Sequence, residues 1–142
     1  MKNFNEKLSK QLLTYFKNQS KDFENLLKKL VSFQTFSKET KKINLFLDYL
    51  EDLFSTYHPR IERFHTDNGD ILKLSHFSQN KDFLVLLSHV DTVKVSDYFV
   101  PIKIRGEKFY GNGCYDMKSA VLLFYFALKA IEKFSLPINK EI

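Results

Sequence analysis

With 142 residues and a hydrophobic content of 44%, the chain has the size of one domain and enough apolar residues to build a core. Its formal net charge of +5 does not predict a nucleic-acid partner, because the lysines are spread and interleaved with acids, without a basic run or a C-x-x-C motif. The longest apolar run, residues 120–128, is too short to span a bilayer, no signal peptide is visible, and the single Cys114 cannot form an internal disulfide. We therefore expect a cytoplasmic protein with neither nucleic acid nor a membrane as its partner.

Apolar side chains in the first part of the chain recur at the three- and four-residue spacing of amphipathic helices. The spacing predicts a helix over residues 23–31 and another over residues 43–54, and it indicates a helix over residues 4–16 less strongly. Ser37 is placed as the N-cap of the 43–54 helix, with Glu39 in its first turn.

After Pro59 the pattern changes to short extended segments. Residues 61–64 and 71–74 flank the sequence DNGD (67–70), whose composition predicts a turn between two strands. Residues 83–88 form a continuous apolar run, which is expected of a strand that is covered on both faces.

The last part of the chain combines a glycine-rich loop with a long apolar helix. FYG and GNG precede this predicted helix, which covers residues 118–134 and is closed by Pro137, and residues 138–142 resemble the beginning of another strand. Together with the preceding helices and strands, this order predicts an α/β fold, a three-layer α/β/α domain.

Two stretches could carry chemistry, and the first is SHVDTV, at the end of the 83–88 run. In an open α/β sheet, ligands bind beyond the carboxyl ends of the strands. His89 and Asp91 are two residues apart, so on an extended chain their side chains lie on one side and the carboxylate can hold an imidazole N–H. A metal-bound histidine typically has this arrangement. The simpler alternative is a histidine at a strand end, followed by an aspartate that begins a turn.

The second stretch is GNGCYDMKSA, where the 118–134 helix begins. Asp116 stands where a dinucleotide-binding loop would have its third glycine, and its charge would repel a phosphate. An acid at this place can simply complement the helix dipole. An acid beside a histidine at strand ends suits a divalent metal better, with Gly111 and Gly113 allowing the tight turn that brings Asp116 into the site. Lys118 is assigned to the helix start or to the surface near the site.

LLSHVDTV followed by FYGNGCYDMKSA and an apolar helix resembles the M20 family of zinc peptidases and deacylases. That family includes glutamate carboxypeptidases, aminoacylases, acetylornithine deacetylase and succinyl-diaminopimelate desuccinylase. The resemblance runs from about residue 23 to the end, because LLKKLVSFQTF and INLFLDYLEDLF also lie where the family has helices. It implies that residues 21–142 are the N-terminal part of a zinc-peptidase-like catalytic domain, and that residues 1–20 are an N-terminal helical extension.

The resemblance also implies a role for each matching residue. His89 would bind a zinc ion, Asp91 would orient His89, and Asp116 would bridge two zinc ions. The bond from Asp116 to Met117 stands where the family often has a cis peptide. The implied chemistry is metal-assisted hydrolysis of an amide bond in a peptide or an N-acyl amino acid.

The same resemblance predicts an incomplete enzyme. In the family, a Glu-Glu pair on the next strand supplies the general base and a further ligand, and the other ligands and a lid and dimerisation domain follow. The sequence ends at Ile142, before such a Glu-Glu strand. We therefore expect an inactive N-terminal portion that lacks the lid domain, and whether this chain is itself an enzyme stays open. The alternatives are half of a split enzyme completed by a C-terminal partner chain, and a non-catalytic M20-like binding domain.

Overall fold

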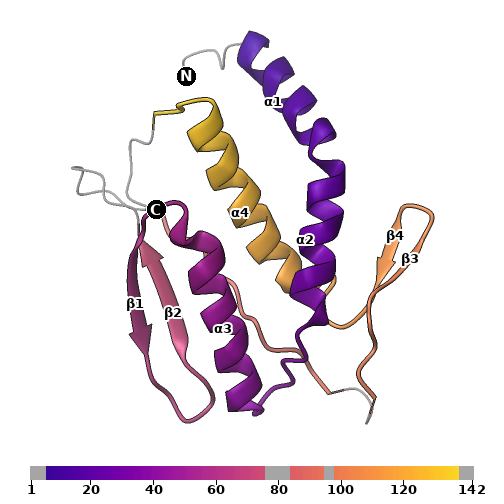
Figure 1. Cartoon of the computed structure of the whole chain (residues 1–142), viewed down its shortest axis with the longest axis vertical. Coiled ribbons are helices and arrows are strands. Elements are labelled where there is room, and N and C mark those ends of the chain that lie inside the picture. Colours follow the sequence, from indigo (N-terminus) through magenta and orange to yellow (C-terminus); the bar gives the residue numbers. More distant parts are fainter. Residues whose placement is uncertain (1–5, 76–83, 95–97, 138–142) are drawn as a thin grey trace.

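The computed structural model describes residues 6–75, 84–94 and 98–137 (Figure 1). In chain order, its elements are α1 (Glu6–Asn18), α2 (Ser20–Ser32), α3 (Thr40–Ser55), β1 (Arg60–Phe64), β2 (Ile71–Ser75), β3 (Lys103–Arg105), β4 (Lys108–Tyr110) and α4 (Lys118–Lys133). None of the helices in these ranges is long and apolar enough to cross a membrane. The strand predicted over residues 138–142 lies outside the described residues.

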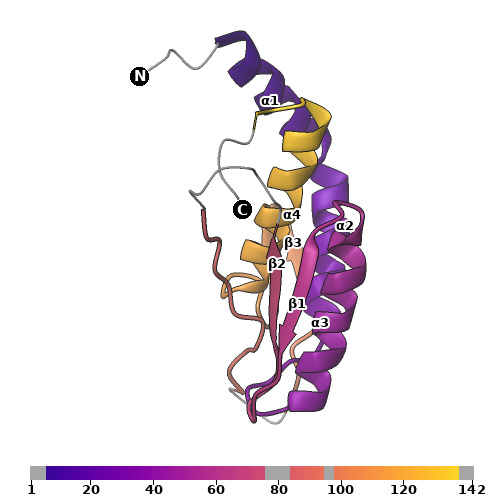
Figure 2. The ribbon, with the colours of Figure 1, turned by 90° about the vertical axis from the view of Figure 1, so that its left-hand side faces the viewer.

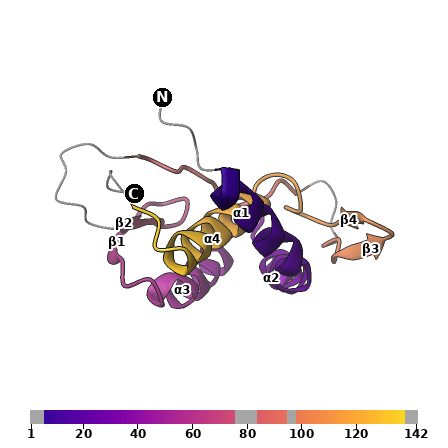
Figure 3. The same cartoon turned by 90° about the horizontal axis from the view of Figure 1, so that it is seen from above.

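The predicted helices are confirmed, and their apolar stripes form the core. Leu30 of α2, Phe46 of α3 and Leu122 of α4 have no exposed surface, which is where the apolar face of an amphipathic helix belongs. α4 packs against α2, and it lies between α2 and α3 both from the front and from above (Figures 1 and 3). The three helices therefore share one hydrophobic core.

The predicted N-cap of α3 is wrong. The helix begins at Thr40, its N-cap position is Glu39, and no side-chain hydrogen bond caps it. Lys38 adopts a φ of 74°, which turns the chain between Ser37 and the helix. Ser37 is thereby kept out of the first helical turn, and its hydroxyl group donates a hydrogen bond to Asp91 instead.

β1 and β2 form the predicted hairpin and pair antiparallel over their whole length. Gly69, in the turn between them, has a φ of 116°, which a residue with a Cβ rarely adopts. Arg63 ties the hairpin to α3, because its guanidinium group donates to the backbone carbonyl of Asn44 at 3.1 Å and to Glu51 at 3.2 Å. β3 and β4 form a second antiparallel pair, which projects away from the helices (Figure 1).

The strand predicted over residues 83–88 is wrong for the part that is described. Residues 84–88 belong to no strand, and Leu87 is 83% exposed. An apolar strand is buried only when it has neighbours in a sheet and layers on both faces. In the described part of the chain, the sheets are two separate antiparallel pairs, β1–β2 and β3–β4, and neither includes this run. Figure 2 shows the extended 84–94 segment and the β1–β2 hairpin on one side of α3, so the described elements form a partial, mixed α/β arrangement.

Candidate functional site

The connection between α2 and α3 holds the segment that carries His89 and Asp91. A parallel bridge joins Phe36 to Thr92, and the amide of Thr92 donates to the carbonyl of Thr35 at 2.7 Å. The Thr35 hydroxyl group also donates to the carbonyl of Val90 at 2.7 Å. Because these bonds involve the backbone on both sides of Asp91, they define the path of the chain through the predicted site.

The structure brings the three predicted site residues together. Nδ1 of His89 lies 3.0 Å from the backbone carbonyl of Asp91 and 3.2 Å from its Oδ1. On the other side of the ring, Nε2 lies 3.0 Å from Oδ1 of Asp116. The imidazole group therefore lies between two carboxylates that are separated in sequence by the whole β3–β4 segment.

All the groups that face the ring nitrogens of His89 are oxygen acceptors. A neutral ring that carries its proton on Nδ1 donates to Asp91, where two acceptors lie. In a neutral ring, Nε2 then carries a lone pair, yet it faces another acceptor, the Asp116 carboxylate. Two acceptors at this distance are stable if the ring takes a second proton, if the Asp116 carboxyl group is protonated, or if both bind a cation.

The two neighbouring aspartates affect the pKa of His89. Partial burial disfavours the charged ring, but the hydrogen bond to Asp116, the contact with the Asp91 backbone carbonyl and the charges of both carboxylates together raise the pKa above its ordinary value. The same negative potential that favours a second proton favours any other cation at Nε2.

Asp116 reaches the site from the loop before α4. The N-cap of α4 is Met117, without a side-chain capping bond, and the Asp116 carboxylate contacts His89. The expected cis peptide between Asp116 and Met117 is confirmed. The loop is closed by the Lys118 amide, which donates to the carbonyl of Gly113 at 3.1 Å.

Gly113→Ala is expected to destabilise the chain by about 1–3 kcal/mol. Gly113 has a φ of 81°, and a Cβ there would lie 3.0 Å from Cδ of Lys118 and 3.1 Å from Cγ2 of Thr92. Gly106→Ala is the matched control, because Gly106 also has a positive φ, of 59°, but a Cβ there meets nothing within 4 Å. Urea denaturation compares the two variants, and equal losses would contradict the steric part of this prediction.

Lys118 is the first residue of α4, so its assignment to the helix start is confirmed. Its assignment to the surface is wrong, because Lys118 has no exposed surface. Its ammonium group donates to the backbone carbonyl of Phe33 at 2.5 Å and lies 4.9 Å from the ring centroid of Phe46. Burial lowers the pKa of Lys118 to about 8. The sequence holds a signal for this burial: Lys118 lies three and four residues before Val121 and Leu122, on the face of α4 that enters the core.

Ser37 is a second residue that the sequence prediction misplaced. Its hydroxyl group donates to Oδ2 of Asp91 at 2.6 Å. The sequence holds no local signal for this contact, because the two residues meet only through the pairing of residues 35–37 with residues 90–92. Cys114 packs against the hydrophobic core, and burial raises the pKa of its thiol group, which disfavours a nucleophilic thiolate.

The donor atoms fit a zinc ion in type but not in number. An imidazole nitrogen and a carboxylate oxygen are ordinary zinc ligands, and catalytic zinc normally takes three protein ligands. In the described ranges, no group of three or more His, Cys, Asp or Glu side chains could hold a metal ion. His65 does not add to the site, because it pairs with Asp70 at 3.0 Å, beside the β1–β2 hairpin. The described residues therefore hold two candidate ligands, His89 and Asp116.

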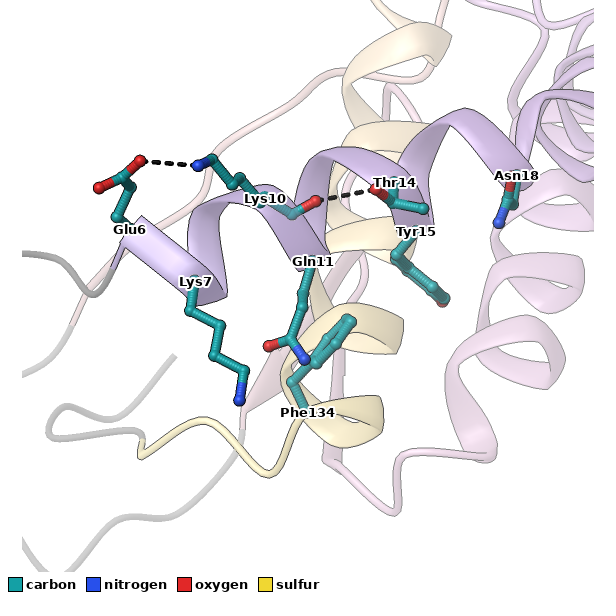
Figure 4. Close-up of a pocket in the computed structure, with 8 residues that line it drawn as sticks. All are labelled: Glu6, Lys7, Lys10, Gln11, Thr14, Tyr15, Asn18 and Phe134. Atoms are coloured by element: carbon teal, nitrogen blue, oxygen red, sulfur yellow. Dashed lines mark hydrogen bonds and ion pairs between the residues drawn. The ribbon is translucent and has the colours of Figure 1, made fainter.

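A groove of about 710 Å³ lies at the other end of α4, between this end and α1 (Figure 4). It is lined by α1 side chains and Phe134, and the Glu6–Lys10 ion pair lies at its edge. His89 and Asp116 lie near the first turn of α4, whereas Phe134 follows its last turn. The groove is thus separate from the site.

Comparison with known proteins adds information at the level of structure. No family model matches the chain, and no curated protein sequence matches it. Its fold resembles that of human carnosine dipeptidase 1. The superposition has a TM-score of 0.78 and covers 94% of this chain and 33% of the dipeptidase chain, at 16% sequence identity. At this identity the likeness to the dipeptidase shows the fold alone, and the chain spans about a third of the dipeptidase's length.

Proposed function

We propose that the chain is part of a metal-dependent hydrolase that cleaves amide bonds in peptides or N-acyl amino acids. Two separate observations support this class of activity. The SHVDTV and GNGCYDMKSA motifs resemble those of the M20 zinc peptidases and deacylases, and the fold resembles that of a protein named as a dipeptidase. In this proposal the described elements belong to a three-layer α/β/α catalytic domain.

The observation that carries the proposal is the contact between Nε2 of His89 and Oδ1 of Asp116. With Nδ1 donating to Asp91, these two acceptors face each other at 3.0 Å and together form a binding position for a cation. We assign zinc to this position, with His89 and Asp116 as ligands and Asp91 orienting the His89 ring. When bound, zinc supplies a Lewis acid that polarises a carbonyl group and makes a bound water more acidic.

The remaining ligands and the general base come, in this proposal, from polypeptide other than the described residues. Two candidate ligands are fewer than catalytic zinc requires. Additional polypeptide of this kind is consistent with the comparison, because this chain covers 33% of the length of the dipeptidase. The missing groups would follow residue 137 in the same polypeptide or lie on a C-terminal partner chain.

A non-catalytic M20-like binding domain is the second candidate. It is favoured by the same shortage of ligands within the described part of the chain. In that case the His89–Asp116 contact would be a structural ion pair, with the second proton on the ring in place of a metal.

Titration with zinc is expected to separate the two candidates. The native chain should bind zinc weakly, and His89→Ala should lower the affinity at least tenfold, because it removes one of two ligands. His65→Ala is the matched control, since His65 is also an exposed histidine with a carboxylate 3.0 Å from Nδ1. Isothermal titration calorimetry at pH 7.5 measures the zinc affinity of the native chain and of the two variants. Equal affinity of the native and His89→Ala chains would refute the metal site.

Hydrolysis assays test the rest of the proposal. Dipeptides and N-acyl amino acids are offered to the chain alone and to the chain co-expressed with the polypeptide encoded downstream of it. We expect zinc-dependent release of amino acid in the second case and none in the first. Zinc binding without hydrolysis in either case would refute the hydrolase assignment and leave the metal site in place.

A further inference from the structure

We infer that Ser37 is a positioning residue of this site, acting on His89 through Asp91. The hydrogen bonds form a continuous chain from the α2–α3 connection to Asp116. The Ser37 hydroxyl donates to Oδ2 of Asp91 at 2.6 Å, Oδ1 of Asp91 lies 3.2 Å from Nδ1 of His89, and Nε2 lies 3.0 Å from Asp116. The metal-binding consequence rests on the proposed function, whereas the hydrogen-bond chain is present without a metal.

Both oxygens of the Asp91 carboxylate are used in this arrangement. A hydroxyl-to-carboxylate distance of 2.6 Å lies in the range of charge-assisted hydrogen bonds, which are stronger than neutral ones. With Oδ2 held by Ser37, the carboxylate plane is fixed and Oδ1 is directed at the His89 ring. Asp91 is 40% exposed, and the Ser37 bond adds a second restraint on its rotation beside the contact with His89.

Ser37 is itself held by the backbone. Its amide donates to the carbonyl of Thr92 at 3.0 Å, and the amide of Thr92 donates to the carbonyl of Thr35 at 2.7 Å. The positive φ of Lys38 then directs the chain into α3. Because backbone pairing holds Ser37 against Thr92, the residue after Asp91, its short side chain reaches the Asp91 carboxylate.

The same connection also holds the Asp116 side of the site. Lys118, two residues after Asp116, donates to the carbonyl of Phe33 at 2.5 Å, four residues before Ser37. Residues 33–37 thus contact the Asp116 loop at one end and Asp91 at the other. Ser37 is the member of this connection whose side chain reaches the His89–Asp91 pair directly.

Ser37→Ala and Ser37→Thr test the inference on the full chain, with zinc chloride as the probe. Ser37→Ala should weaken zinc binding by up to about tenfold, because Ser37 acts one contact further out than a residue bonded to a metal ligand, whose loss costs at least about that much. Ser37→Thr keeps the hydroxyl group and should restore affinity to within about threefold. Ser55→Ala is the matched control, because the Ser55 hydroxyl group donates to a carbonyl of its own helix, away from the site.

A second readout keeps the test independent of zinc. In the zinc-free chain, the ring ¹⁵N and Nδ1-bound proton resonances of His89 report the hydrogen bond from Nδ1–H to Asp91, and Ser37→Ala should move them while Ser37→Thr and Ser55→Ala should not. Unchanged His89 resonances in Ser37→Ala would overturn the inference. If the native chain binds no zinc while the resonances move as expected, the proposed function fails and the positioning role of Ser37 stands.

Discussion

Phe46→Ala is expected to destabilise the chain by about 3–5 kcal/mol, the cost of removing a large aromatic side chain from a core. Phe46 has no exposed surface. Its ring packs against Phe33 at a centroid distance of 4.9 Å, and the Lys118 ammonium group lies 4.9 Å from its centroid. The loss is comparable with the whole stability of many domains, about 5–15 kcal/mol, so the variant should be largely unfolded or close to it.

Urea denaturation followed by circular dichroism measures this effect, with Phe46→Leu as a graded variant that keeps most of the apolar volume. Leu45→Ala is the matched control, because Leu45 is the neighbouring residue of α3 and is 61% exposed. It should change stability by less than about 0.5 kcal/mol. Similar losses in Phe46→Ala and Leu45→Ala would mean that α3 does not pack its Phe46 face into the core.

Between pH 8 and pH 10, the native chain is expected to gain stability relative to a Lys118→Met variant. Burial lowers the pKa of Lys118 in the folded chain to about 8, whereas its ordinary value is 10.5. Between these values the unfolded chain binds a proton that the folded chain does not, so raising the pH favours folding. The slope is at most about 1.4 kcal/mol per pH unit. Methionine has a similar length and no charge, so it removes this contribution.

Urea denaturation of both chains at pH 7, 8, 9 and 10 in the presence of a chelator gives the difference in the free energy of unfolding. Lys133→Met, at the last turn of the same helix, controls for the loss of one positive charge. A native-minus-Met difference that does not change with pH would show that folding does not lower the pKa of Lys118. Lys118→Met also leaves the Phe33 carbonyl without its donor, which lowers stability at every pH by about 1–3 kcal/mol.

These two residues connect the core to the site. Phe46 packs beneath the Lys118 ammonium group, and Lys118 holds the Phe33 carbonyl at the beginning of the connection that carries Ser37. The geometry of His89, Asp91 and Asp116 therefore depends on packing between α3 and α4, and a core variant that leaves the chain folded can still disturb the site.

The sequence by itself determined the features that depend on near neighbours. The apolar spacing within α2, α3 and α4 specifies these helices because residues three and four apart share a helix face. The turn sequence around Gly69 specifies the β1–β2 hairpin because that position needs a positive φ. The pairing of His89 with Asp91 also follows from a two-residue separation on an extended chain.

Only the tertiary structure decided the features that depend on distant partners. Leu87 has the composition of a buried strand residue but is exposed, because no strand pairs with its segment within the described residues. Ser37 has the local signature of an N-cap, yet the backbone pairing with Thr92 directs its hydroxyl group to Asp91. Lys118 is charged and stands at a helix start, but α3 and the Phe33 carbonyl enclose its ammonium group. Propensity and spacing act over a few residues, whereas burial and hydrogen-bond partners are set by whichever segments the fold brings together.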